Sequence, residues 1–191
     1  GNVASRDAYE RLSEWGADSI RVGIGGGSIC STRIQTGHGC PTLQSILDCA
    51  ESEHDTTIIA DGGMRTSGDA VKALAAGADF VMLGSLLAGT TETPGELFEG
   101  KRGKKYKVYR GMASKEAQKD WRGTHSSNEG ISTTVPFKGP VKDILEDLEN
   151  GIRSGLSYSG SRTVYGLQFK AQFVKQTGAG QIESSTHILR R

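Results

Sequence analysis

The chain has 191 residues, of which 35% are hydrophobic and 24% are charged, a composition typical of one soluble globular domain. Its net charge of +1 argues against nucleic acid or a membrane surface as a partner, so we expect a small molecule or another subunit. Three cysteines without CxxC spacing indicate neither a disulfide framework nor a zinc site, and they favour a reducing cytoplasm. No apolar run approaches the roughly 20 residues that cross a bilayer, and no export signal is expected.

The first of three similar units is "YERLSEWGADSIRVGIGGG", residues 9–27, which reads as a helix, a short link, a strand and a glycine turn. Leu12 and Trp15 fall on one helical stripe, and Trp15 is expected in the core. Gly16 suits the position just after the helix, and the apolar residues of 20–24 begin a strand.

The second and third units are "LQSILDCAESEHDTTIIADGG" and "VKALAAGADFVMLGS". Ser67 or Asp69 is expected to cap a helix over 71–76 that ends at Gly77, before a continuously apolar strand over 80–83. Helices that alternate with apolar strands predict an α/β fold with a parallel sheet. The glycine turns at 23–27, 62–63 and 84 follow the strands, so we expect them to form one ligand-binding floor.

The second half of the chain has a different character. "KRGKKYKVYRGM" predicts a hairpin or strand, and its basic residues are either a solvated turn or a means of steering an anionic nucleotide. The polar residues 113–134 are expected to form a surface loop or an active-site flap. A helix follows, with Val141, Ile144, Leu145 and Leu148 on one face, and then a strand and a tail over 175–191. With no linker in sight, residues 1–191 are expected to form one domain.

The stretch "GIGGGSIC" leaves three interpretations open: a phosphate cradle, a nucleophile loop or a flexible turn. A lone cysteine such as Cys30 is more often a small buried hydrophobe than a nucleophile. Asp61 stands at a strand end, where a carboxylate suits a ribose diol, and the alternative is a helix cap or turn acid. "LGS" and "YRGM" offer further backbone amides for a phosphate.

In combination, the motifs "GIGGGSICSTR", "ADGGMRTSGDAVKALAAGADFVMLGSLLAGT", "YRGM", "VPFKGPV" and "GLSYSG" resemble the catalytic barrel of the IMP dehydrogenase and GMP reductase family. The resemblance implies a (β/α)8 TIM barrel, of which this chain would supply the C-terminal half with the flap and the tail. An eight-stranded barrel needs about 250 residues, and "GNV" resembles the end of the fifth strand. The chain is therefore expected to be partial.

The resemblance also implies roles for individual residues. Cys30 would attack C2 of a purine to form a covalent thioimidate, with Thr32 and Glu129 handling protons and Arg122 as a displaced version of the dehydrogenase flap arginine. The positions that match phosphate, ribose or base contacts, or lie in the same glycine turns, are Ser28, Asp61, Gly62, Gly63, Gly84, Ser85, Tyr109, Gly111, Met112, Glu129 and Gly130.

A potassium ion and a homotetramer are implied as well. The carbonyls of Gly25, Gly27 and Cys30 would bind the ion, and a neighbouring subunit's Glu183, Ser184 and Ser185 would complete the site. The leading expectation is NAD-dependent oxidation of IMP to XMP, and the alternative is NADPH-dependent reduction of GMP to IMP. The short spacing from Cys30 to Glu129 and the missing tyrosine after Arg122 resemble the reductases, whereas "RTSGD" and the "ESS" tail resemble the dehydrogenases. An inactive nucleotide-binding half-barrel is the third possibility.

Overall fold

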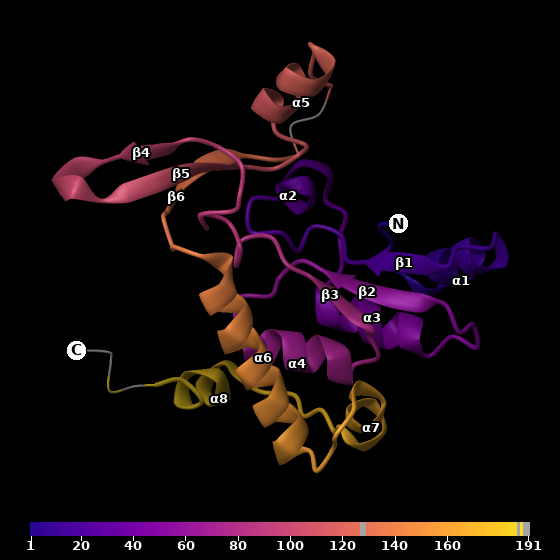
Figure 1. Ribbon diagram of the computed structural model, residues 1–191. Helices are drawn as coiled ribbons and strands as arrows, with labels where there is room; N and C mark the ends of the chain where they lie inside the picture. Colours follow the sequence, from indigo (N-terminus) through magenta and orange to yellow (C-terminus); the bar gives the residue numbers. More distant parts are fainter. Residues whose placement is uncertain (127–128, 187, 189–191) are drawn as a thin grey trace.

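The computed structural model describes residues 1–126, 129–186 and 188, and its first half is a parallel α/β unit (Figure 1). Strands β1 (Ser19–Val22), β2 (Thr57–Asp61) and β3 (Phe80–Met82) lie side by side in the order β1-β2-β3, all parallel. Helices α1 (Arg6–Glu14), α3 (Thr42–Ala50) and α4 (Ser67–Ala75) alternate with them. The predicted α/β class with a parallel sheet is confirmed.

The core lies between the helices and one face of this sheet. Ile20 and Val22 of β1 and Ile58 and Ala60 of β2 are buried, and they pack with helix side chains that include Ile46. Alternate strand residues point to the other face, because successive side chains of a strand point to opposite sides. Within the part of the chain that the structure describes, one face of the sheet is therefore covered and the other is open.

Two expectations of burial are wrong. Phe80 is 62% exposed and Met82 37% exposed, so the apolar run of β3 does not have two buried faces here. Trp15 was expected in the core but is 78% exposed, because it is the C-cap residue of α1 rather than part of its packed stripe. The apolar run over 80–83 predicted strand β3 correctly, but it could not show which face of the parallel sheet this chain covers.

The helix ends follow from local chemistry. The N–H groups of Gly16 and Ala17 donate to the carbonyls of Ser13 and Leu12, a Schellman motif that ends α1 at the expected glycine. The cap of α4 differs from the prediction: Thr66 is the N-cap, and Asp69 closes a capping box with it. The sequence had offered Ser67 or Asp69 as the cap.

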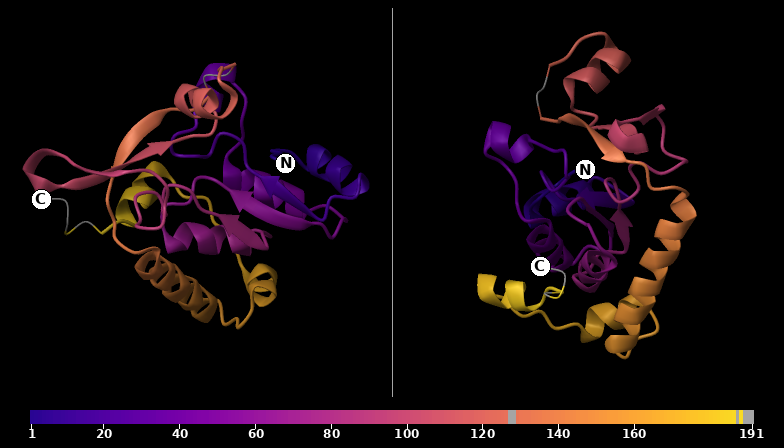
Figure 2. Two further views of the ribbon diagram at one scale, coloured as in Figure 1. Left: turned by 45° about the horizontal axis from the view of Figure 1, so that its top comes forward. Right: turned by 90° about the vertical axis from the view of Figure 1, so that its left-hand side faces the viewer.

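In the described part of its second half, the chain forms an antiparallel sheet and four more α-helices. Strands β4 (Leu97–Glu99), β5 (Lys105–Arg110) and β6 (Ser132–Pro136) pair in that order, with a 3-10 turn η1 (Lys101–Gly103) at the β4–β5 connection. The helices α6 (Val141–Tyr158) and α7 (Val164–Lys170) pack on α4, and α8 (Gly178–Glu183) follows. Figure 2 shows α6 leading from the antiparallel sheet toward α7. None of the helices in the described ranges is long and apolar enough to cross a bilayer.

Two segments differ from their sequence-based expectation. The polar stretch 113–134 contains a helix, α5 (Lys115–Arg122), which begins at the buried N-cap Ser114 and buries Ala117 and Gln118. The strand expected before the tail does not form, since residues 171–177 run without regular structure into α8. Helix α5 buries few residues, so its sequence shows no clear helical repeat of apolar residues. Residues 171–177 pair with no described strand.

Gly23, which ends β1, offers a test of this packing. Its φ is +137° and an added Cβ would lie 2.1 Å from the carbonyl oxygen of Asp61, whereas Gly16 has φ +87° and nothing within 4 Å. We expect Gly16→Ala to cost roughly 1 kcal/mol, from backbone strain alone, and Gly23→Ala about 3 kcal/mol or more, from strain plus overpacking. Urea unfolding of the two variants measures the difference, and equal losses would contradict the close approach of the two strand ends.

Candidate active site

The glycine turns after β1 and β2 meet at the carboxyl edge of the parallel sheet. An added Cβ on Gly62 would lie 3.0 Å from the Gly27 nitrogen, so the turns after β1 and β2 are in backbone contact. The turn after β3 meets the antiparallel sheet instead, where an added Cβ on Gly84 would lie 3.2 Å from the Tyr109 hydroxyl. Three of the predicted phosphate positions, Gly63, Gly84 and Tyr109, therefore belong to these contacting segments.

Cys30 is held by a small ladder with the segment that precedes β6. Cys30 and Gly130 form an antiparallel bridge. The Ser31 N–H donates to the Glu129 carbonyl at 2.8 Å, and the Ile131 N–H donates to the Ile29 carbonyl at 3.1 Å. The backbone thus fixes the cysteine directly beside the residues predicted as its acid partner and base contact.

The side chains of this ladder form a hydrogen-bond chain with one direction. The Cys30 thiol donates to the Thr32 hydroxyl at 3.2 Å between Sγ and Oγ1. That hydroxyl donates in turn to the Glu129 carboxylate at 2.8 Å between Oγ1 and Oε2. Thr32 begins the short helix α2 (Thr32–Thr36), and Cys30 and Glu129 are half-buried. A proton leaving the thiol therefore has a continuous path to a carboxylate, which is the arrangement that activates a nucleophile.

The segment 111–114 lies against the same ladder. The Gly111 N–H donates to the Ile131 carbonyl at 3.2 Å, and an added Cβ on Gly130 would lie 2.8 Å from the Ser114 nitrogen. Met112 is 74% exposed and is therefore available to a ligand. Gly111, Met112 and Gly130, all predicted base contacts, lie together next to Cys30.

Asp61 ends β2 and accepts two hydrogen bonds that the sequence did not reveal. Its Oδ2 accepts from Asn2 Nδ2 and from Arg21 Nη2, both at 2.7 Å. Because the helix-cap alternative would require backbone N–H donors, these partners argue against it. Arg21 alternates with buried residues along β1, and this charged position within an apolar strand was the available signal.

Arg33 is a second residue that sequence reasoning missed. Its guanidinium donates to the Ile24 carbonyl at 3.1 and 3.2 Å and also to the Cys40 carbonyl. An added Cβ on Gly25 would lie 2.5 Å from Arg33 Cγ, which places the arginine directly against the glycine loop. Arg33 therefore ties the glycine loop, through Ile24, to Cys40 in the segment before α3.

Two predicted groups lie apart from this ladder. Arg122 is the last residue of α5, with its guanidinium carbon 4.4 Å from the centroid of the exposed Trp121 ring. Glu183, Ser184 and Ser185 lie at and beyond the end of α8, on the opposite side of the parallel unit from α2 in Figure 1. Within one chain, Glu183, Ser184 and Ser185 therefore lie apart from the glycine loop. No cluster of three or more His, Cys, Asp or Glu side chains suited to a metal occurs among the described residues.

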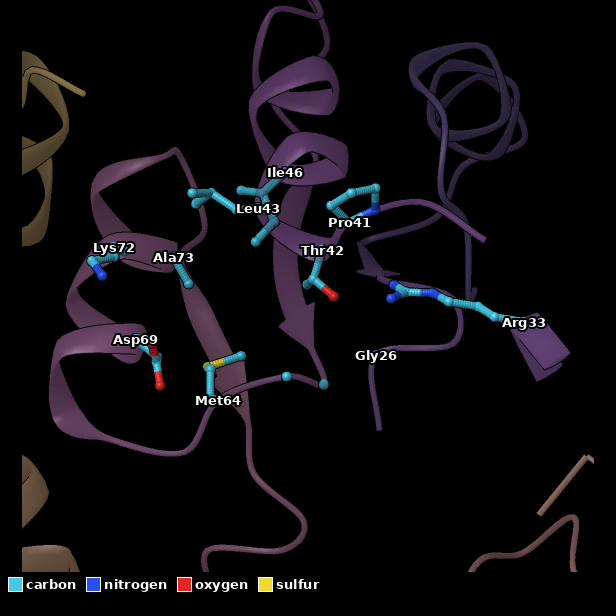
Figure 3. A pocket seen from close by; sticks show the side chains of 12 residues that line it. Gly26, Arg33, Pro41, Thr42, Leu43, Ile46, Met64, Asp69, Lys72 and Ala73 are labelled. Atoms are coloured by element: carbon cyan, nitrogen blue, oxygen red, sulfur yellow. The ribbon is translucent and has the colours of Figure 1, made fainter. Parts of the chain in front are cut away.

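A cavity of about 370 Å³ opens behind the glycine turns, between α3 and α4 (Figure 3). Backbone of Gly26, Gly62 and Gly63 forms its floor, and Figure 3 shows Arg33 and Thr42 on one side with Lys72 on the other. Cys30 is not among the residues that line it. The cavity therefore borders the candidate site without containing its nucleophile.

The three cysteines carry free thiols in different surroundings. Burial raises the pKa of Cys49 to about 11, and its side chain is 1% exposed. At pH 8 such a thiol is ionised to only about one part in a thousand, and the thiolate is the reactive form. We expect iodoacetamide to modify the half-buried Cys30 and Cys40 but not Cys49, as measured by peptide mass spectrometry. Labelling in urea is the control, and rapid modification of Cys49 in the folded protein would contradict its burial.

Comparison with known proteins places these features in context. A sequence model described as "IMP dehydrogenase / GMP reductase domain" matches residues 1–187. The chain is 47% identical to the inosine-5'-monophosphate dehydrogenase of Nitrosopumilus maritimus and 46% identical to the GMP reductase of Leishmania major. These alignments cover 98% of this chain but only 42% and 40% of the two relatives.

A solved structure gives the same result. The crystal structure of a cysteine-to-alanine variant of GMP reductase from Trypanosoma brucei, in complex with guanosine 5'-monophosphate, matches with a TM-score of 0.92 at 45% identity. The match covers 98% of this chain and 40% of that chain. The present chain thus spans about two fifths of the length of the proteins that it resembles.

Proposed function

Because the chain belongs to the IMP dehydrogenase / GMP reductase family, we propose that it forms part of a purine-nucleotide oxidoreductase in which Cys30 bonds covalently to C2 of the base. The reaction we propose is NAD-dependent oxidation of IMP to XMP, a step toward guanine nucleotides. One observation carries the proposal: the directed hydrogen-bond chain from the Cys30 thiol through Thr32 to Glu129. The chain would be the C-terminal half of a (β/α)8 barrel, with residues 113–134 as its flap and 175–191 as its tail.

The chemistry follows from that chain of hydrogen bonds. The thiol proton passes through Thr32 to Glu129 while the sulfur bonds to C2, because the thiolate is the nucleophilic form. The electron pair of the C2=N3 double bond moves to N3 and re-forms that bond when the hydride leaves. The nicotinamide cofactor, when bound, accepts the hydride that leaves C2. Water then adds to C2, the C2–S bond breaks, and the sulfur regains a proton as XMP is released. Glu129 gives and takes protons in the two halves of the reaction.

The nucleotide would lie across the carboxyl edge of the parallel sheet. Asp61 would accept hydrogen bonds from the ribose diol, and Gly111, Met112 and Gly130 would contact the base. The phosphate would be bound by backbone N–H groups and hydroxyls, which suit an anion. The residues proposed for it are Ser28, Gly62, Gly63, Gly84, Ser85 and Tyr109.

Exposed apolar side chains next to the cysteine ladder fit a nicotinamide. Ile34, which lies on α2 shortly after Cys30, is 83% exposed, and Ile131 is 51% exposed. Flat aromatic ligands bind on such apolar surfaces beside a few polar groups. These residues would position NAD or NADP near C2 and exclude water from it during hydride transfer.

The carbonyls of Gly25, Gly27 and Cys30 fit a potassium ion, because backbone carbonyl oxygens can replace its hydration shell. The Gly27 oxygen accepts the Cys30 N–H at 3.1 Å, which leaves a second lone pair for an ion. A bound ion would stiffen the loop that carries the nucleophile. Since Glu183, Ser184 and Ser185 do not reach this loop within one chain, we propose that a neighbouring subunit supplies them in a cytoplasmic homotetramer.

GMP reductase is the second candidate, with NADPH-dependent reduction of GMP to IMP through the same cysteine. It is favoured by the glycine that follows Arg122, where family dehydrogenases carry a tyrosine. The bound GMP of the trypanosomal relative agrees with it. A nucleotide-binding half-barrel without activity of its own remains the third candidate.

A paired assay tests the three candidates. The full-length protein is incubated with IMP and NAD in one reaction and with GMP and NADPH in the other, and absorbance at the nicotinamide band is followed. We expect NADH formation with IMP. NADPH consumption with GMP alone would establish the reductase, and inactivity in both reactions despite nucleotide binding would leave the binding module.

A further inference from the structure

The turn that follows β3 is held from behind by a single lysine. Lys138 Nζ donates to the Ser85 carbonyl at 2.8 Å and to the Leu86 carbonyl at 3.0 Å. Lys138 comes two residues after the end of β6 and is separated from this turn by more than 50 positions in sequence. Its side chain therefore joins the parallel unit to the antiparallel sheet.

The backbone around Lys138 makes the same connection. The Lys138 N–H donates to the Gly89 carbonyl at 2.9 Å, and the Thr91 N–H donates to the Gly139 carbonyl at 2.8 Å. Both ends of the lysine are thus fixed to residues 85–91. Partial loss of water around the ammonium lowers the pKa of Lys138, as expected when carbonyls replace part of its water.

The two accepting carbonyls determine how the turn presents its amides. A peptide group is planar and trans, so a Ser85 carbonyl that points to Lys138 turns the N–H of Leu86 in the opposite direction. The N–H groups of Leu87 and Ala88 are already bonded to the Gly84 carbonyl, each at 3.0 Å. The amides left to face a ligand are those at the start of the turn, beside Gly84 and the Tyr109 hydroxyl.

We propose that Lys138 is the positioning residue of the phosphate site: by holding the Ser85 and Leu86 carbonyls, it orients the amides that bind the nucleotide 5'-phosphate. The inference rests on the proposed function, which places the phosphate at Gly84 and Ser85. Lys138 does not touch the substrate in this role. Its positive charge behind the peptide groups also strengthens their dipoles toward the anion. Because β6 leads directly from the segment of Glu129, the same residue ties the phosphate turn to the proton acceptor.

The test compares two ligands that differ only in the phosphate. Isothermal titration calorimetry measures the affinities of the full-length protein and of Lys138→Met for GMP and for guanosine. We expect the ratio of GMP to guanosine affinity to fall by at least about tenfold in the variant, while guanosine affinity changes by less than about threefold. Lys138→Arg keeps the charge and the donors, so it should restore most of the ratio.

Lys107→Met is the matched control. Lys107 Nζ also holds two carbonyls of a neighbouring segment, those of Thr91, at 3.1 Å, and Thr93, at 2.5 Å, but not the phosphate turn. The Lys107→Met substitution should leave the ratio of GMP to guanosine affinity unchanged, even if it lowers the stability of the protein. If Lys138→Met does not fold, Lys138→Gln is measured in its place.

The outcomes separate this inference from the proposed function. An unchanged ratio in the folded Lys138 variant, with GMP still preferred by the wild type, overturns the positioning role. A wild-type protein that binds GMP no better than guanosine overturns the phosphate assignment itself. A ratio that falls equally in Lys107→Met would show a general loss of packing and would also reject the specific role.

Discussion

Cys30→Ala should abolish turnover of the nucleotide while its affinity stays within about tenfold of the wild-type value, or roughly 1.4 kcal/mol. The reason is that the proposed mechanism needs a bond from the Cys30 sulfur to C2, whereas phosphate, ribose and base contacts come from other residues. A steady-state assay measures turnover, and calorimetric titration with IMP or GMP measures affinity.

Cys40→Ala is the control for the loss of a thiol. Cys40 is half-buried like Cys30, and its backbone carbonyl, which the substitution retains, accepts from Arg33. We expect its turnover to remain within a few-fold of the wild-type rate. Comparable turnover in the Cys30 and Cys40 variants would remove Cys30 from the mechanism.

Glu129→Gln should lower turnover by about 10²- to 10⁴-fold, the range that general acid–base catalysis contributes. An amide of the same size still accepts a hydrogen bond from the Thr32 hydroxyl, but it does not take up the proton that leaves Cys30. Stopped-flow measurement of the first turnover separates thiol activation from product release. The loss should appear in the first turnover and in the steady state.

Glu116→Gln is the matched control for this carboxylate. Its Oε2 accepts from the Ser132 hydroxyl at 2.8 Å, the same distance as the pair of Glu129 with Thr32, but it has no link to the thiol. A loss of similar size in both variants would contradict the relay.

Arg122→Ala tests a different step, the activation of water. A hydrolysis rate about 10²-fold lower with an intact NADH burst would identify Arg122 as the water-activating base.

Local patterns in the sequence were enough to predict the parallel unit. The glycine after α1 ends that helix as expected, and the strand that carries Ile20 and Val22 buries both. These features depend on a few adjacent residues and on elementary backbone chemistry. The position of the glycine loop after β1 followed from the same reasoning.

Other features depend on residues far apart in the sequence and were not predictable from local pattern. The bonds from Asn2 and Arg21 to Asp61, and from Lys138 to the turn after β3, join segments that have no common period. Thr32 and Glu129 were paired only through a family resemblance, because 97 positions separate them. The exposure of Trp15 and Phe80 reflects which surfaces this chain covers, and a hydrophobic pattern does not contain that information.

The ladder between Cys30 and Glu129 has a kinetic consequence. The hydrogen bond from Thr32 to Glu129 closes a loop of 97 positions, and the entropy cost of closing a loop grows with the logarithm of its length. Contacts between such distant segments also form slowly during folding. The parallel strands can pair before this loop closes, since each β–α–β unit is local. We therefore expect Cys30 to meet Glu129, its proposed proton acceptor, late in folding, so that recovery of activity after dilution from denaturant lags behind recovery of helical circular dichroism.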